Sequence, residues 1–212
     1  PTSGGSSAKA LAETLRGTIR NADGGGTTLA IGGGNKADYT RASQLIGVNN
    51  TLTGTAGSVS DYNMINGYKN TASQVRHVSV IVSENTVNNT TDAVVMGNIV
   101  LGSADGAMTT GVTDAVSIGH NANVTEAGGV ALGSQSKAST AAGAAGYDPS
   151  TRALSQDTSS TWKATAAAVS VGDGTTVTRQ LTSVAAGTND TDAVNVAQLK
   201  QAVLSAGTGT DT

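Results

Sequence analysis

Ala115-Val-Ser-Ile-Gly119 and Gly129-Val-Ala-Leu-Gly133 are two copies of one five-residue run, separated by 14 residues. In each run, apolar residues alternate with small ones and a glycine closes the segment. Alternation of this kind predicts a short strand, and the glycine permits a turn. A period of 14 residues is too short for a helical repeat but suits two short strands and two turns. The pair therefore predicts one coil of a β-solenoid.

Further copies extend the repeat toward the N-terminus. Leu29-Ala-Ile-Gly32 and Gln44-Leu-Ile-Gly47 fit the template, and Val94-Val-Met-Gly97 is interpreted as another copy. The spacing drifts between 14 and 20 residues, which predicts insertions in the turns while the strands stay in register. The strand positions expected to carry the repeat are Leu29, Ile31, Val94, Met96, Val116, Ile118, Val130 and Leu132.

Two copies depart from the template. Asn63-Met-Ile-Asn-Gly67 has Asn66 at an apolar position, and Val78-Ser-Val-Ile-Val-Ser83 has Ser83 at the glycine position. We expect distorted coils at these two places. The segments between strands are rich in Asn, Thr, Ser and Gly, residues that tolerate turns and left-handed backbone. Their asparagines are expected to be structural and to form ladders along the stack.

The composition narrows the class of protein. The 212 residues include 28 Gly, one Trp, four Tyr and no Phe, and 13% are charged, against roughly 25% in a typical soluble domain. Such a chain cannot build a thick core, so thin stacked layers are expected. A net charge of -3 offers no basic surface for nucleic acid. The absence of Cys excludes disulfides and thiolate metal sites.

The two ends differ from the repeat. Residues 1–27 are expected to be a lead-in and an irregular cap, with a short helix permitted between Ala8 and Arg20. Near the other end, Val196, Leu199 and Val203 are spaced three and then four, as in the seam of a coiled coil. Either Thr191 or Asp192 is expected to cap this helix. One heptad is too short to be stable alone, so the seam predicts association of several chains.

Residues 141–168 interrupt the repeat with a turn-rich excursion that contains Trp162. This tryptophan is expected to anchor the excursion by packing. A sharper interpretation makes it a receptor contact, because an exposed tryptophan can dominate an interface. Tyr62 and Tyr68 are the other candidate receptor contacts, each with packing as the alternative role.

These residues resemble the trimeric autotransporter adhesins of Gram-negative bacteria. The runs that end at Gly119 and Gly133 are similar to the YadA-like head repeat. Thr178-Arg-Gln-Leu181 and Asp192-Ala-Val-Asn-Val-Ala-Gln-Leu199 are similar to the neck of this family. Val169-Ser-Val-Gly172, after Trp162, resembles the final section of such heads. The likeness covers roughly residues 28–203.

The resemblance implies an all-β fold, a left-handed parallel β-roll head over residues 28–177 in a homotrimer. A neck over 178–195 and the start of an α-helical coiled-coil stalk with its tail over 196–212 would follow. It also implies type V secretion and display outside the bacterial outer membrane, through a C-terminal barrel absent from this chain. No enzymatic activity, cofactor, metal or nucleic-acid partner is expected.

The implied function is polyvalent adhesion, in which three identical faces bind a host receptor. Family members bind collagen and other matrix proteins, carcinoembryonic-antigen-related cell adhesion molecules, or immunoglobulins, and some bind one another in autoagglutination and biofilms. The segment Tyr62-Asn-Met-Ile-Asn-Gly67 is similar to fusobacterial heads, which favours a carcinoembryonic-type receptor.

Two other solenoid functions fit less well. A β-helix acyltransferase would need a period of six and a catalytic histidine, and neither His77 nor His120 lies beside an acid or nucleophile in the sequence. An ice- or mineral-binding solenoid would need a threonine ladder at the repeat period. The threonines are interpreted as lying in turns, as at Thr90-Thr91 and Thr109-Thr110.

Overall fold

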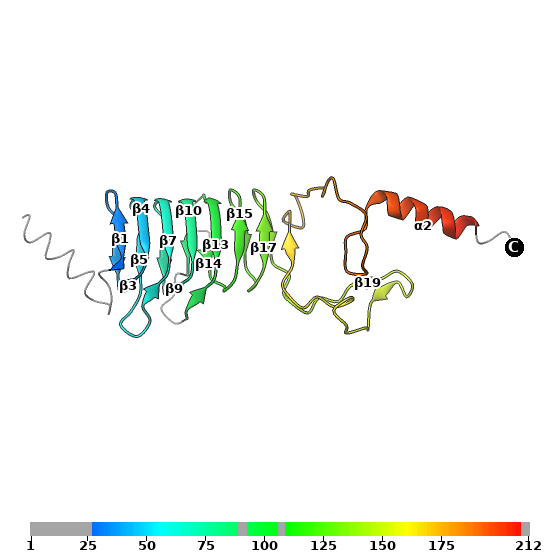
Figure 1. Cartoon of the computed structure of the whole chain (residues 1–212), viewed down its shortest axis with the longest axis horizontal. Coiled ribbons are helices and arrows are strands. Elements are labelled where there is room, and N and C mark those ends of the chain that lie inside the picture. Colours follow the sequence, from blue (N-terminus) through cyan, green and yellow to red (C-terminus); the bar gives the residue numbers. More distant parts are fainter. Residues whose placement is uncertain (1–26, 89–92, 106–108, 209–212) are drawn as a thin grey trace, which may run out of the picture. The chain divides into compact units, whose positions relative to one another are not determined.

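A computed structural model describes residues 27–88, 93–105 and 109–208 (Figure 1). The expected N-terminal cap lies outside the described residues, apart from residue 27. The chain divides into two compact units. The first runs to Gly143 and resumes over Ala166–Thr178, and the second comprises Ala144–Thr165 and the chain from Arg179 onward.

The first unit is a parallel β-solenoid, as the repeat predicted, and Figure 1 shows its coils side by side. Its main sheet has eight strands, and each coil adds one strand in sequence order. All seven pairings are parallel and in register. The strands are β1 (Leu29–Ile31), β4 (Gln44–Val48), β7 (Met64–Tyr68), β10 (Ser79–Ser83), β13 (Ile99–Ser103), β15 (Val116–Ile118), β17 (Val130–Leu132) and β21 (Val169–Ser170).

Further sheets complete the walls of the solenoid. The second sheet contains β2 (Lys36–Asp38), β5 (Thr51–Thr53), β8 (Thr71–Ser73), β11 (Thr86–Val87) and β14 (Thr109–Thr110). The third sheet contains β3 (Thr40–Arg41), β6 (Ser60–Asp61), β9 (Val75–Arg76) and β12 (Val95–Met96). In the later coils, β16 (Asn123–Val124) pairs with β18 (Lys137–Ala138). The first four coils are therefore three-sided, and the later coils are two-sided.

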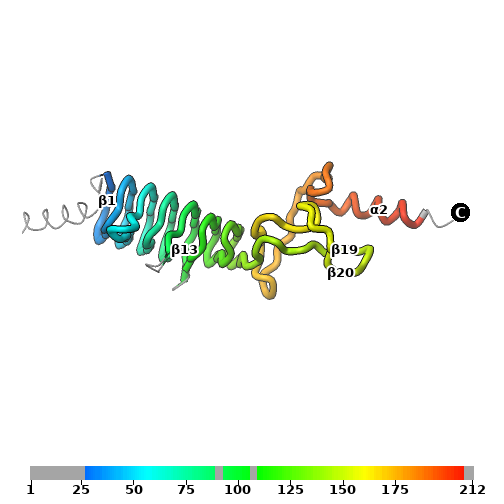
Figure 2. The backbone as a smooth tube through the Cα atoms, turned by 90° about the horizontal axis from the view of Figure 1, so that it is seen from below, coloured from blue at the N-terminus to red at the C-terminus, as the bar shows by residue number. Residues whose placement is uncertain are grey.

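The core follows this change of shape. Alternate strand residues point inward, and in the three-sided coils they are large, with Leu45, Ile65 and Val80 fully buried. In the two-sided coils the buried positions hold smaller residues such as Ala115 and Ala131. Figure 2 shows the successive coils stacked along this unit. A third strand thus encloses the volume that Leu and Ile need, and the buried strand residues of the two-sided coils are smaller, namely Ala, Ser, Thr and Val.

The second unit carries a short hairpin and a helix. Strands β19 (Tyr147–Asp148) and β20 (Ala153–Leu154) pair antiparallel, and α2 spans Val196–Thr208. Between Ala144 and Thr165 the chain belongs to this unit, and it then returns to the solenoid as β21. In the described parts of the chain, no helix has the length and apolar character needed to cross a membrane.

One repeat assignment was wrong. Val94 precedes β12 and lies outside any strand, and Met96 belongs to the third sheet, where β12 pairs with β9. The main-sheet strand of that region is β13, which the sequence presents directly afterwards. The wrong assignment arises because these coils have a third side. Its strand resembles the repeat in sequence but does not belong to the main sheet.

The glycine assignment in β10 also changes. Val82, not Ser83, pairs with Gly67 on one side and with Gly102 on the other. A Cβ on Gly67 would lie 1.7 Å from the carbonyl oxygen of Val82, so only glycine fits at Gly67. Asn66 does occupy an apolar row, between Ile46 and Ile81, yet both neighbours pair in full register and the expected distortion is absent from these strands.

A ladder of asparagine amides ties the three-sided coils together. The amide oxygens of Asn35, Asn50 and Asn70 each accept from both the backbone N–H and the side chain of the next asparagine, and each Nδ2 of the ladder also donates to a carbonyl oxygen of the following coil. The middle two members, Asn50 and Asn70, are fully buried. Their buried amides are thereby satisfied. The ladder consists of Asn35, Asn50, Asn70 and Asn85.

Replacing Asn70 with alanine should weaken the solenoid. The change removes the side-chain bonds to Asn50, Val82 and Asn85 and leaves buried groups unpaired. We expect the free energy of unfolding to fall by about 2–4 kcal/mol, measured by urea denaturation with far-UV circular dichroism. Asn123→Ala, which removes a half-buried side chain on β16, is the control and should change it by less than about 0.5 kcal/mol. Equal effects of the two changes would contradict the ladder.

Replacing Val82 with glycine should stabilise the protein. Val82 has φ of 101°, which a β-branched residue rarely adopts, and such strain costs about 1–3 kcal/mol. Because glycine itself costs about 0.5–1 kcal/mol through backbone entropy, we expect a net gain of about 1 kcal/mol and a higher Tm. Val48→Gly, at the exposed end of β4, should lower the Tm. A lower Tm for Val82→Gly would show that the residue is unstrained.

Candidate receptor-binding and assembly surfaces

The outer face of the main sheet carries an apolar strip that runs the length of the solenoid. Because side chains alternate along a strand, the residues flanking each buried position point outward. Seven of them are between 36% and 53% exposed. A monomeric protein rarely leaves so many apolar side chains of one face in water, so this face is a candidate interface. The seven are Leu29, Ile31, Met64, Ile99, Leu101, Ile118 and Leu132.

Six of the eight predicted repeat residues lie on this face. Val116 and Val130 join the strip beside the leucines and isoleucines, in register with Ile99. Three polar residues interrupt it on consecutive coils, namely Gln44, Asn66 and Ser79. The strip is therefore most apolar at its two ends and polar near β7.

The outer face of the second sheet carries a threonine ladder. Thr51, Thr71, Thr86 and Thr109 are paired in register on successive strands. The interpretation of Thr109-Thr110 as a turn was wrong, because these residues form β14. Each coil has a second strand within what the sequence presents as an Asn- and Thr-rich turn. This face is polar, unlike the apolar strip, and β2 continues its outward rows with Lys36 and Asp38.

The third sheet places two arginines around one carboxylate. Arg41, Asp61 and Arg76 are neighbours on β3, β6 and β9. Arg41 Nη2 donates to Asp61 Oδ2 at 2.9 Å, and Arg76 Nε lies 3.3 Å from Asp61 Oδ1. The Asp61 side chain is 4% exposed, whereas the two arginine side chains are 36% and 39% exposed. The carboxylate thus lies beneath two guanidinium groups that reach solvent.

An aromatic pair lies at the corner next to these charges. Tyr62 and His77, which follow Asp61 and Arg76 in the chain, stack with ring centroids 4.9 Å apart and planes inclined by 17°. Both residues are exposed and both have positive φ, which turns the chain at the corner. The face formed by Arg41, Asp61, Arg76, Tyr62 and His77 is called the arginine–tyrosine face below.

The three predicted receptor contacts belong to different parts of the chain. Tyr62 belongs to the arginine–tyrosine face, whereas Tyr68 ends β7 and is 47% exposed at a different corner of the coil. Trp162 belongs to the second unit and is half-buried. Its backbone carbonyl accepts from Gly146 N–H at 2.7 Å, which ties the two arms of the excursion.

Sequence spacing missed the surroundings of His120. Stacking places its Nδ1 2.5 Å from Ser103 Oγ and its Nε2 2.9 Å from Asp105 Oδ2. Hydrogen bonds from Asn121 and His120 lower the pKa of Asp105. The contact between Ser103 and His120 could have been predicted only by knowing that residues 17 apart lie side by side on these two coils. The cluster is exposed at a turn, and within the described residues no group of three or more His, Cys, Asp or Glu side chains could hold a metal ion.

The neck begins its helix with a capping box. Asn195 Oδ1 accepts from Gln198 N–H at 3.0 Å, and Gln198 Oε1 accepts from Asn195 N–H at 3.2 Å. The expectation that Thr191 or Asp192 caps this helix was wrong. Asp192 instead accepts from the N–H groups of Thr188 and Asn189, and these bonds lower its pKa.

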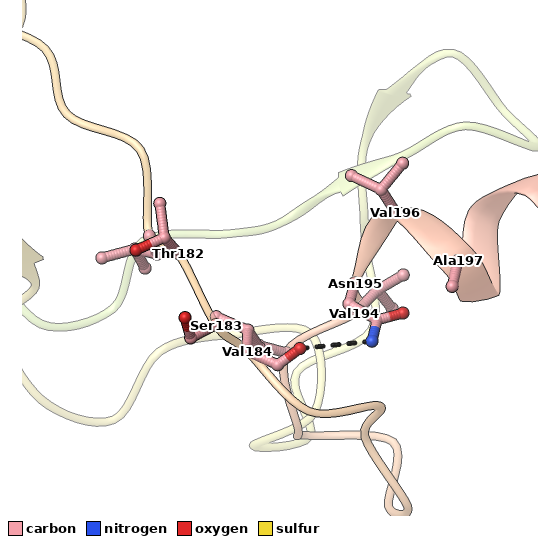
Figure 3. Close-up of a pocket in the computed structure, with 9 residues that line it drawn as sticks. Thr182, Ser183, Val184, Val194, Asn195, Val196 and Ala197 are labelled. Atoms are coloured by element: carbon pink, nitrogen blue, oxygen red, sulfur yellow. Dashed lines mark hydrogen bonds between the residues drawn. The ribbon is translucent and has the colours of Figure 1, made fainter.

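A hollow of about 530 Å³ lies between two segments of the neck, residues 181–184 and 193–197 (Figure 3). Asn195 Nδ2 donates to the carbonyl oxygen of Val184 across it, at 3.2 Å. Its apolar residues are largely exposed, with Leu181 and Val194 both at 70%. On α2, the predicted seam residues Val196, Leu199 and Val203 are 59–68% exposed. The neck therefore presents apolar side chains that nothing in one protomer covers.

Comparisons with known proteins point to one family. A family profile described as the coiled stalk of trimeric autotransporter adhesin matches residues 180–212. The autotransporter adhesin BadA of Bartonella henselae is 57% identical over 72 residues, which is 34% of this chain. This chain spans about 2% of the length of that relative.

A solved structure, the collagen-binding domain of the Yersinia adhesin YadA, is 22% identical with a TM-score of 0.42. It covers 82% of this chain, and 86% of the YadA chain is covered. The stalk match and the sequence identity to an adhesin agree with the repeat and neck motifs and with the solenoid that the structure describes. This chain is similar to the trimeric autotransporter adhesins over its stalk segment and over the 72 residues that match BadA.

Proposed function

We propose that this chain is the receptor-binding head of an adhesin displayed outside the bacterial cell, and that it acts as a homotrimer. The observation that carries the proposal is the apolar strip on the outer face of the main sheet. In the trimer, three strips pack against one another around a common axis. The adhesin names of its relatives support the same function.

The physical case for the trimer is burial of apolar surface. Covering a half-exposed leucine or isoleucine stabilises an assembly by about 1 kcal/mol, and the strip offers such residues on β1, β13, β15 and β17. The helix α2 gives a second argument, because its 13 residues are too few for a stable isolated helix. When Val196, Leu199 and Val203 pack as a seam between three helices, the contacts between the helices stabilise α2.

The trimer leaves the second and third sheets free for receptors. Three copies of each face then bind together, so modest affinity at one face becomes strong attachment. Tyr62, Tyr68 and Trp162 remain the proposed contacts. The receptor classes we propose are collagen or another matrix protein, and carcinoembryonic-antigen-related cell adhesion molecules. Self-association and immunoglobulin binding are the alternatives, and catalysis plays no part in this function.

The mass in solution tests the trimer. Light scattering on the purified chain at about 100 μM should give three times 20.8 kDa. Ile118→Glu places charges on the apolar strip, and we expect it to shift the protein to monomer because three buried carboxylates would repel one another. Thr86→Glu, on the outer face of the second sheet, is the matched control and should remain trimeric. A monomeric wild type, or a trimeric Ile118→Glu, would contradict the proposal.

Polyvalent adhesion requires the trimer. Wild type should bind an immobilised receptor from a panel of collagens, other matrix proteins and carcinoembryonic-type receptors, measured by biolayer interferometry. The monomeric Ile118→Glu variant should bind at least about 100-fold more weakly, because avidity is lost. Thr86→Glu is the control for the added charge. If the second sheet itself contacts the receptor, Asn123→Glu is the control instead. Equal binding by monomer and trimer would exclude a polyvalent mechanism.

A further inference from the structure

The arginine–tyrosine face occurs only where the solenoid is three-sided. Its strands β3, β6, β9 and β12 belong to the first four coils, and the later coils have no equivalent among the described residues. These coils therefore present a surface that the basic repeat does not provide. Thr40, Ser60 and Val75 are the inward, buried residues of the third sheet, whereas Arg41 and Arg76 lie on its outer face over the buried Asp61.

The charges on this face are arranged to receive an anion. A guanidinium group has five N–H donors, and Asp61 receives one hydrogen bond from Arg41 and an ion-pair contact from Arg76 Nε. The terminal nitrogens of Arg76 have no protein partner within the described residues. Two arginines against one buried aspartate leave a net positive charge. The buried carboxylate holds both guanidinium groups in place, so their outer edges are pre-organised.

A planar guanidinium edge matches a carboxylate, with two parallel N–H···O bonds. Tyr62 and His77 directly follow Asp61 and Arg76 in the chain, and both stacked residues are exposed to solvent. The electron-rich face of an aromatic ring attracts the C–H groups of a sugar ring. A ligand that contacts both the guanidinium groups and the aromatic pair therefore carries a carboxylate on a sugar ring.

We propose that the arginine–tyrosine face binds a carboxylated sugar, with the carboxylate on Arg41 and Arg76 and the sugar ring against Tyr62 and His77. The site lies within one protomer and needs no partner chain. It deepens the proposed adhesive function, on which its biological meaning rests, because a trimer would repeat it three times and bind a glycan-coated surface with avidity.

Titration of the full chain with 3′-sialyllactose, followed by saturation-transfer NMR and calorimetry, tests the site. A glucuronate-containing hyaluronan tetrasaccharide is the second carboxylated source, and neutral lactose and a sulfated disaccharide are the comparison sugars. We expect at least one carboxylated sugar to bind with a Kd of about 1 mM. Binding should be at least about tenfold tighter than that of lactose or the sulfated disaccharide, and it should weaken as salt is added.

Substitutions on the arginine–tyrosine face and a control substitution outside it test whether the sugar binds to this face. Arg76→Gln should weaken binding at least about tenfold, because it removes the charge-assisted bonds. Arg76→Lys keeps the charge that Asp61 requires and should weaken binding less, and Tyr62→Ala should also weaken it. Lys69→Gln removes the same charge from an exposed turn of the same coils and should leave the affinity unchanged. The Tm of each variant shows that it is folded.

Three results would overturn the proposal: no binding of either carboxylated sugar, tighter binding of the sulfated disaccharide or lactose, or an Arg76→Gln variant that binds like wild type. If Arg76→Gln does not fold, the folded Arg76→Lys and Tyr62→Ala variants decide the question. Light scattering on the same samples reports the trimer separately. A protein that is trimeric but binds no sugar therefore refutes this site, and one that binds sugar as a monomer refutes the assembly.

Discussion

Parallel stacking of successive coils is the constraint on which the rest of this structure depends. Each coil donates its backbone N–H groups to the coil that follows, as Gln44 does to Asn63 and Met64 to Val78. Asparagine side chains repeat the same bonds inside the stack, so the buried polar groups are satisfied without large side chains. The chain can therefore fold with no Phe and very few other aromatic residues.

Registration places equivalent positions of successive coils on the same wall, so each wall has its own prevailing chemistry. One wall collects apolar residues, a second collects threonines, and the third, in the first four coils, places two arginines around Asp61. Glycine at the end of the main strand, as at Gly47, lets neighbouring coils approach closely. The apolar wall can be covered by copies of the same chain, and the other two remain available for receptors.

The repeat and the neck could be predicted from the sequence because strand alternation, glycine spacing and the coiled-coil seam are local patterns. The third side of the coils could not. Its strands are two residues long, too short for a periodic signal, and Val95–Met96 resembled a main strand. The contacts Arg41–Asp61–Arg76 and Ser103–His120–Asp105 join residues 15 to 20 apart, with separations that change from coil to coil. Only the register reveals them.

Cysteine cross-linking tests the central claim, that the apolar strip is the face on which protomers meet. The chain has no Cys, so a single introduced residue reports one position. Under mild oxidation, Leu101→Cys, on the strip, should give a covalent two-chain species on denaturing gels, because three copies meet near one axis. Thr86→Cys, on the second sheet, should give none at the same concentration. Cross-linking through Thr86→Cys and not through Leu101→Cys would place the interface on another wall and contradict the account.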